Sequence, residues 1–202
     1  MSSENPDAPD TRSKILMSAW ELLEAAQGRE VRMSDIAKRA GLSRQAVYLH
    51  FPTRAELLLA TTHHIDAVKR IDHRLSKSRA AETGTERLSA FIEAWGNYIP
   101  EIYGVGKALM MMSDTDEAAK LAWDDRMNAV REGCEAAVNA LARDRQLSPA
   151  HSPAQATDIL WALLSVPTWE SLRFGCGWPQ DLYIGKMKAL ARQTLVRAPS
   201  AG

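Results

Sequence analysis

Helical hydrophobic periodicity runs through almost all of the 202 residues, and this pattern constrains the fold more than any other feature. Apolar residues recur every three or four positions, as they do on the buried face of an amphipathic helix. Signals for strands are nearly absent, because the sequence has no Asn-Gly or Asp-Gly hairpin turn and no sustained alternation of β-branched residues. The sequence therefore predicts an all-α protein of about nine helices.

Composition and charge exclude several classes of protein. Hydrophobic residues make up 46% and charged residues 25% of the chain, which is typical of a soluble globular protein. The 25 basic residues balance the 25 acidic ones, so net charge indicates no particular partner. No apolar run of about eighteen residues occurs, so we expect no membrane span. The acidic, proline-containing residues 1–10 predict a disordered tail rather than a signal peptide.

The segment GLSRQAVYLHF, residues 41–51, has the turn and capping residues of a helix-turn-helix. Gly41 stands where a helix ends in a left-handed residue, and Ser43 can cap the helix that follows. Phe51 must end that second helix, because a residue before proline resists the helical conformation. We expect Leu42, Val47 and Phe51 to hold the second helix against the first.

Four side chains of the second helix would then remain outside: Arg44, Gln45, Tyr48 and His50. Arginine and glutamine can each make two hydrogen bonds to base edges in the major groove, and tyrosine and histidine can donate to phosphates. Residues 32–54 contain five basic residues against the single acid Asp35, in an otherwise neutral chain. This pattern favours DNA binding; the alternative is an ordinary three-helix corner with a solvated polar face.

Residues 11–60 resemble the N-terminal domain of the tetracycline-repressor (TetR) family of transcriptional regulators. The matching pieces are Thr11-Arg12 with Ile15-Leu16, Asp35-Ile36-Ala37 with Ala40-Gly41-Leu42-Ser43, Val47-Tyr48-x-His50-Phe51, and Glu56-Leu57-Leu58. The resemblance implies a DNA-binding domain over residues 11–55 and a larger helical effector-binding and dimerisation domain over residues 56–202. Independently of the resemblance, the chain has only two cysteines, and this low content fits a reducing cytoplasm better than a disulfide framework.

Carried over by position, the resemblance assigns roles to individual side chains. Arg44, Gln45 and Ala46 face bases, Tyr48 and His50 contact backbone phosphate, and Thr11, Lys38 and Thr53 are secondary phosphate contacts. Two positions depart from the family pattern. Arg32 stands where a hydroxyl residue usually caps the second helix, so Ser34 could cap it instead, and Gln45 stands where a small residue is frequent.

The helices after the helix-turn-helix are predicted only from hydrophobic periodicity and from capping, glycine and proline residues. Thr53 and Glu56 form a capping box, which predicts a long helix from there into the 70s. Further helices are expected from about residue 85 to a break near Pro100, over 109–112 after a loop at Gly104 and Gly106, from Asp114 or Thr115 to about 141, over 153–174 with a bend at Pro167, and over 180–197. Ser152 and Gln155 form a second capping box.

The larger half offers candidate sets for an effector pocket and for a dimer interface. Aromatic and methionine side chains suited to an apolar pocket are Phe91, Trp95, Tyr98, Tyr103, Met111, Trp123, Met127 and Trp161. For any one of them, plain core is the alternative. The last two long helices are apolar on more than one side, which predicts a four-helix-bundle interface between two chains through Leu160, Leu163, Leu164, Met187 and Leu190.

Signals for other chemistry are weak. His63 and His64 are adjacent and point apart on a helix, so no metal site is expected, and Cys134 and Cys176 are expected to be buried structural thiols. No motif of a hydrolase, zinc protease or nucleotide-binding enzyme occurs, and no cofactor is expected. The sequence thus predicts a homodimeric repressor that binds a palindromic double-stranded operator and leaves it when a small, largely apolar effector binds. The alternatives are an activator or DNA-binding protein without an effector, and a helical enzyme with a degenerate helix-turn-helix.

Overall fold

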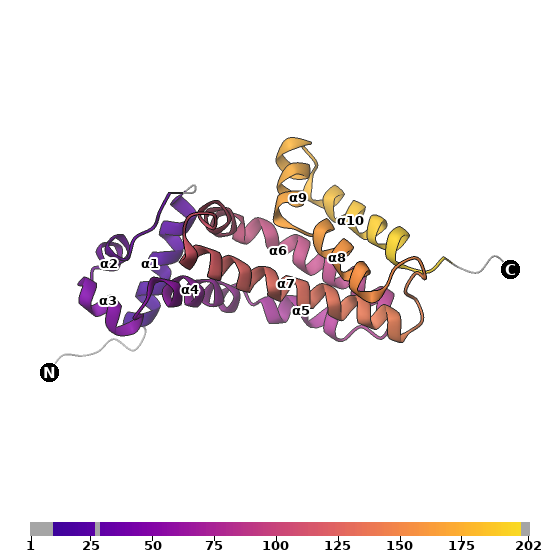
Figure 1. Ribbon diagram of the computed structural model, residues 1–202, viewed down its shortest axis with the longest axis horizontal. Coiled ribbons are helices and arrows are strands. Elements are labelled where there is room, and N and C mark those ends of the chain that lie inside the picture. The colour runs from indigo at the N-terminus through magenta and orange to yellow at the C-terminus, as the bar shows by residue number, and fades with distance from the viewer. Residues whose placement is uncertain (1–9, 27–28, 199–202) are drawn as a thin grey trace. The chain divides into compact units, whose positions relative to one another are not determined.

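The computed structural model describes residues 10–26 and 29–198, and these residues form ten α-helices and a short π-helix without any β-strand (Figure 1). The predicted all-α architecture is therefore confirmed. The helices are α1 (Thr11–Ala26), α2 (Met33–Ala40), α3 (Arg44–His50), α4 (Arg54–Val68), α5 (Ile71–Arg79), α6 (Gly84–Met112), α7 (Glu117–Arg143), α8 (Pro153–Leu163), α9 (Val166–Glu170), the π-helix η1 (Ser171–Gly175) and α10 (Gln180–Leu195). The expected tail lies outside the described residues except for Asp10.

The helices group into two compact units. One unit comprises residues 1–69 and 104–126, and the other comprises residues 70–103 and 127–202. Helices α6 and α7 each contribute residues to both units. The functional division into a DNA-binding domain and an effector-binding domain stays a prediction.

The first unit is built around α1, which packs against α2 and α4. Its apolar face is buried, with Ile15, Ala19 and Leu23 fully inaccessible to solvent. Leu57 and Leu58 of α4 are buried as well. Burial of each of these leucine and isoleucine side chains stabilises the fold by about 1.5–3 kcal/mol, so this face fixes where α1 sits.

An arginine at the start of α4 ties three segments of the first unit together. Arg54 Nε donates to the carbonyl of Val31 at 2.8 Å, and its Nη1 reaches both carboxylate oxygens of Asp116, at 2.7 and 2.5 Å. Asp116 in turn accepts from the backbone N–H groups of Ala118 and Ala119 and so caps α7. Helix α7 therefore begins at Glu117, slightly later than the expected start at Asp114 or Thr115.

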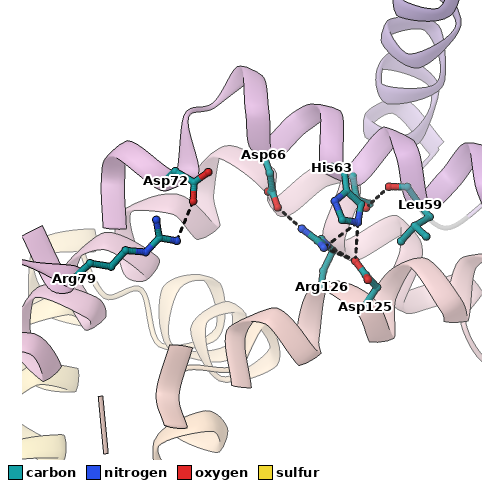
Figure 2. Close-up of polar contacts among 8 residues, drawn as sticks. Leu59, His63, Asp66, Asp72, Arg79, Asp125 and Arg126 are labelled. Carbon is teal, nitrogen blue, oxygen red and sulfur yellow. Dashed lines mark hydrogen bonds and ion pairs between the residues drawn. The ribbon is translucent and has the colours of Figure 1, made fainter. Parts of the chain in front are cut away.

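A second polar network joins α4 to α7 within the same unit. Figure 2 shows His63 and Asp66 of α4 facing Asp125 and Arg126 of α7. His63 Nε2 lies 3.2 Å from an Asp125 oxygen and 3.1 Å from Arg126 Nη2, and Arg126 also pairs with both aspartates. His63 thus lies in a polar network built on the Arg126–aspartate ion pairs. Among the residues described, no group of three or more histidine, cysteine or acidic side chains could hold a metal ion.

The expected break of α6 near Pro100 is wrong, and the second unit shows why. A proline lacks the N–H that would bind the carbonyl four residues earlier, which here belongs to Gly96. Gln180 of α10 supplies the missing donor, because its Nε2 lies 2.7 Å from the Gly96 oxygen. The helix therefore continues through Pro100, and neither the expected loop at Gly104 and Gly106 nor a separate helix at 109–112 exists.

Two other predicted helices are interrupted in the structure. Arg70 adopts a left-handed conformation (φ 57°, ψ 48°) and divides the expected long fourth helix into α4 and α5. An arginine rarely adopts this conformation, so the sequence carries no mark of the break. Pro167 starts a helix instead of bending one: the Ser165 hydroxyl accepts from the Thr168 N–H at 3.2 Å and caps α9, after α8 has ended at Leu163.

None of the helices described is both long and apolar enough to cross a lipid bilayer.

The second predicted capping box is confirmed at the start of α8. The Ser152 hydroxyl accepts from the Gln155 N–H at 3.2 Å, and the Gln155 side chain accepts from the Ser152 N–H at 3.0 Å. Pro153 occupies the first turn, where its missing N–H costs nothing.

Candidate nucleic-acid interface

Helices α2 and α3 form the predicted helix-turn-helix. Gly41 adopts φ 68° and ψ 32°, the left-handed conformation expected at the end of α2. The Ser43 hydroxyl accepts from the Ala46 N–H at 3.1 Å and so caps α3. Phe51 ends α3 in an extended conformation before Pro52. The three local signals read from the sequence are confirmed.

The capping of α2 differs from either expectation. The helix begins at Met33 with Arg32 as its N-cap, and the long cationic side chain of Arg32 makes no capping hydrogen bond. Asp35 compensates in part, because its carboxylate accepts from the Arg32 backbone N–H at 3.3 Å. Ser34 lies inside the helix and does not cap it. One of the α2 terminus donors therefore lacks the hydroxyl acceptor that a serine or threonine would provide.

Buried side chains fix the orientation of α3 against the rest of its unit. Val47 is fully buried and Phe51 is 3% exposed, and both pack in a core that includes Ile36 of α2. The guanidinium of Arg12, at the start of α1, lies 5.1 Å from the centre of the Phe51 ring. A cation this close to a ring face contributes about 0.5–1 kcal/mol at an exposed site. The orientation of α3 is thereby held at its C-terminal end as well as at its cap.

The opposite face of α3 lies open to solvent. Arg44, Gln45 and His50 are exposed, and Tyr48 is 40% exposed. Ala46, the third residue predicted to face bases, is half-buried. A rigid helix that displays donors and acceptors in this way can place them at base edges and phosphates of a duplex.

The predicted secondary phosphate contacts lie at helix starts and on α2. Thr11 begins α1 and is exposed, next to Asp10, whose carboxylate accepts from the Ser13 N–H at 2.6 Å. That hydrogen bond lowers the pKa of Asp10. Thr53 caps α4 by accepting from the Glu56 N–H at 3.1 Å, and its hydroxyl proton can still be donated to a phosphate oxygen. Lys38 is exposed on α2.

The local positive charge is smaller than the sequence suggests. Arg39 pairs with Glu21 at 2.6 Å, Arg32 pairs with Glu30 at 3.0 Å, and Arg54 pairs with Asp116 as described above. Glu21, Glu30 and Asp116 all lie outside the segment 32–54. Among the described residues, Lys38 and Arg44 are the basic side chains of this segment with no carboxylate within ion-pairing distance.

One exposed side chain of α3 was missed by sequence reasoning. Leu49 is 80% exposed, the highest value among the large hydrophobic residues of the described chain. Leucine is ordinarily assigned to a core, and for that reason Leu49 attracted no role. Its spacing carried a signal, since it lies four residues after Gln45 and therefore on the same helix face.

Three of the eight residues expected to line an effector pocket are buried, and the other five are not. In the second unit Phe91, Trp95 and Tyr98 are buried, and the Trp95 indole N–H donates to the Leu164 carbonyl at 2.8 Å. The Trp161 indole N–H lies 3.3 Å from the Met127 carbonyl. The buried Trp95 is packed as a core residue would be, whereas Trp161 is half-buried, and the pocket itself stays a prediction.

The remaining members of the predicted pocket set occupy different environments. Tyr103 donates to Glu170 at 2.7 Å, and burial together with this carboxylate raises the Tyr103 pKa to about 12. In the first unit Met111 is 50% exposed and Trp123 is half-buried. A groove of about 190 Å³ in the second unit has a different lining, in which polar and apolar surface are about equal: Arg74, Lys77, Ala90, Glu93, Ala94 and Asn97.

The predicted dimer contacts separate into two groups. Leu160 and Leu164 are fully buried and Met187 is 2% exposed within a single chain, so their own chain already covers these three side chains. Leu163 is half-buried and Leu190 is 40% exposed, so both remain available to a second chain. Periodicity correctly marked all five as apolar positions but could not tell which neighbour covers each.

The two cysteines also differ from each other. Cys134 is buried as expected, and its burial raises the thiol pKa to about 12. Cys176 is exposed, so the expectation of a buried thiol is wrong there. It follows the π-helix η1 in a segment that ends at Gly177 (φ 70°).

Comparisons with known proteins point to the part of the chain that contains the helix-turn-helix. A family model described as bacterial regulatory proteins of the tetR family matches residues 15–61. The transcriptional regulator EthR of Mycolicibacterium smegmatis is 36% identical over 70 residues, which are 35% of this chain and 31% of that protein. The nucleoid occlusion factor SlmA of Aliivibrio fischeri is 25% identical over 147 residues, 70% of this chain and 71% of the relative. A solved structure of a transcriptional regulator from Saccharomonospora viridis, in complex with choline, has a TM-score of 0.72 at 18% identity and covers 93% of this chain and 98% of that one, a likeness of fold.

Proposed function

The chain belongs to the TetR family of DNA-binding bacterial regulatory proteins, which are not enzymes, and from this premise we propose that it is a homodimeric repressor that a small effector releases from its operator. The observation that carries the proposal is the outer face of α3. It displays Arg44, Gln45, Tyr48 and His50 on a short helix that Ser43 caps and Val47 anchors.

Each exposed side chain has a distinct role in the proposed complex. Arg44 reads guanine through its O6 and N7 atoms, and Gln45 reads adenine through N6 and N7, because these are the bidentate partners that the two side chains fit. Tyr48 and His50 donate to phosphate oxygens, as do Thr11, Lys38 and Thr53. The second group sets affinity for any sequence, and the first sets specificity.

The proposed homodimer would place two copies of α3 on the two halves of a palindromic operator. Leu163 and Leu190, which a single chain leaves partly uncovered, supply its interface together with Phe174 and Leu182, which are 63% and 40% exposed. Glutamate at Leu163 and Leu190 should give folded monomers, because a charge is then placed in an apolar contact. Dimers that persist in sedimentation after both changes would place the interface elsewhere.

The proposed effector is a small, largely apolar molecule that binds the helical region beyond residue 56. It can release DNA only by binding the DNA-incompetent form of the dimer more tightly, and a hundredfold preference supplies about 2.7 kcal/mol. The S. viridis regulator was solved with choline, so choline and neutral apolar compounds are both reasonable first compounds to test.

Selection of duplexes from random DNA, followed by fluorescence anisotropy at several salt concentrations, tests the DNA-binding proposal. Arg44→Ala should lose about 1–3 kcal/mol at one position of the half-site and relax the preference there. Tyr48→Phe should weaken all sequences about equally. Arg79→Ala is a matched control, because Arg79 is an exposed arginine paired with Asp72 in the second unit (Figure 2). If the Arg44→Ala protein selected the same DNA motif as the parent, the proposal that Arg44 reads a base would be refuted.

A DNA-binding protein without an effector is the second candidate. The observation that favours it is the packing of Trp95 and Trp161, whose indole N–H groups already bind backbone carbonyls. The two candidates differ in a measurable way. An effector should lower operator affinity and shift tryptophan emission over the same concentration range, whereas an effector-free protein should show neither change with any compound.

A further inference from the structure

Leu49 lies exposed on α3, and packing within its own chain does not explain why a leucine stands there. The helix is anchored by Val47, which is fully buried, and by Phe51, which is 3% exposed, whereas Leu49 is 80% exposed. A single exposed leucine is unremarkable on a protein surface. Here, however, it stands on a seven-residue helix whose other outward side chains include Arg44 and Gln45.

The position of Leu49 relative to Gln45 defines what it could touch. Residues four apart lie on the same face of a helix, and they are separated by about 6 Å along its axis. Successive base pairs are about 3.4 Å apart. If Gln45 reaches a base edge, Leu49 therefore reaches the floor of the groove within about two base pairs of it.

The major groove offers one apolar group to such a side chain, the C5-methyl group of thymine. Resting on the proposed function as a DNA-binding regulator, we propose that Leu49 is a specificity-determining residue that packs against a thymine methyl in each half-site, next to the adenine read by Gln45. A leucine cannot satisfy a polar base edge, so other bases at this position would lose either the apolar contact or the hydration of their edge.

The competing contact is the deoxyribose at the edge of the groove. Sugars are the same at every position, so that contact would raise affinity for all sequences and would not distinguish thymine. The two possibilities therefore predict different responses to removal of a single methyl group from the DNA.

Deoxyuridine in place of thymidine removes only this methyl group. In a duplex selected by the parent protein, each thymidine of the half-site is replaced in turn, and the dissociation constant is measured by fluorescence anisotropy. Substitution at one position should weaken parent binding about fourfold, the equivalent of about 0.8 kcal/mol for one buried carbon group. With Leu49→Ala the same substitution should change the dissociation constant less than 1.5-fold.

Two controls separate the possible failures. Leu49→Ala should unfold at the same urea concentration as the parent, because the side chain is already in solvent. Val68→Ala, which truncates another exposed apolar residue of the same unit (51% exposed), should keep the full deoxyuridine response.

Three results would overturn the inference: a parent insensitive to every deoxyuridine, an equal response in Leu49→Ala, or a Leu49→Ala loss that is the same for all duplexes. A parent protein that selects no duplex at all would instead refute the proposed function and, with it, this contact.

Discussion

Replacing Gln180 by alanine should destabilise the second unit, and the size of the loss should depend on Pro100. The Gln180 side chain serves two groups at once. Its Nε2 donates to the Gly96 carbonyl at 2.7 Å, and its Oε1 accepts from the Trp169 indole N–H at 3.1 Å. Gly96 and Trp169 are both buried, so neither group can easily turn to water instead.

The magnitude follows from the number of buried groups left without a hydrogen bond. Each orphaned donor or acceptor costs about 1–3 kcal/mol, so Gln180→Ala should lower the free energy of unfolding by about 2–6 kcal/mol. In a Pro100→Ala background the new N–H at position 100 can donate to the Gly96 carbonyl, as in an uninterrupted helix. Only the Trp169 N–H is then orphaned, and the cost of Gln180→Ala should fall by about 1–3 kcal/mol.

A double-mutant cycle measures this difference directly. The parent, both single variants and the double variant are unfolded in urea at one protein concentration, with helix content followed by circular dichroism. Gln193→Ala is the matched control, because Gln193 is an exposed glutamine on the same helix. Its cost should be within about 0.5 kcal/mol of zero. If the effects of Gln180→Ala and Pro100→Ala were additive within about 0.5 kcal/mol, the account of how α6 passes through Pro100 would be wrong.

Four further predictions concern stability and thiol reactivity. Arg32→Ser should raise the free energy of unfolding by about 1 kcal/mol in the same urea assay, because a hydroxyl can cap α2 where the Arg32 side chain does not, and an unchanged midpoint would contradict this. Gly133→Ala should lower it by about 1–3 kcal/mol despite the better helix propensity of alanine, because the added Cβ would lie 2.4 Å from the buried Phe91 ring; a stabilised variant would show that the ring moves aside at little cost. A disulfide reagent at pH 8 should label the folded protein once, at the exposed Cys176, because burial raises the Cys134 pKa to about 12 and leaves little of that thiol as thiolate. Cys176→Ser should abolish the fast reaction. If the fast reaction persisted in this variant, the reactive thiol would not be Cys176. The same raised pKa means that the folded state holds a proton that the unfolded state releases above about pH 8.5, so stability falls as the pH rises from there toward 12.

Much of the candidate interface could be predicted from the sequence, because its shape depends on short-range signals. A left-handed glycine at position 41, a serine cap at 43 and a residue before proline at 51 each act within one helical turn. They fix the boundaries of α3, and the boundaries decide that Arg44 and Gln45 face outward. The exposure of Leu49 could not be predicted in this way, because the hydrophobicity of a leucine does not tell whether packing covers it.

Ion pairs altered the expected electrostatics for a different reason. The sequence shows five basic residues near α3, but Glu21 and Asp116 come from segments before and far beyond it. Only the packing of α1 and of the start of α7 brings these carboxylates to Arg39 and Arg54. Counting charges in a window cannot include partners that the fold supplies from outside the window.

What the sequence determined by itself was the helical class and the helix-turn-helix, since periodicity and capping are local properties that each segment carries whatever surrounds it. Tertiary structure decided the rest. Pro100 would end an isolated helix, but an amide from Gln180, eighty residues later, restores the lost hydrogen bond. Leu160 and Leu164 are apolar in any context, yet only packing determined that their own chain covers them and leaves Leu190 partly exposed. The physical reason is the same in both cases: a polar group or an apolar face requires some neighbour, and the local sequence does not specify which one.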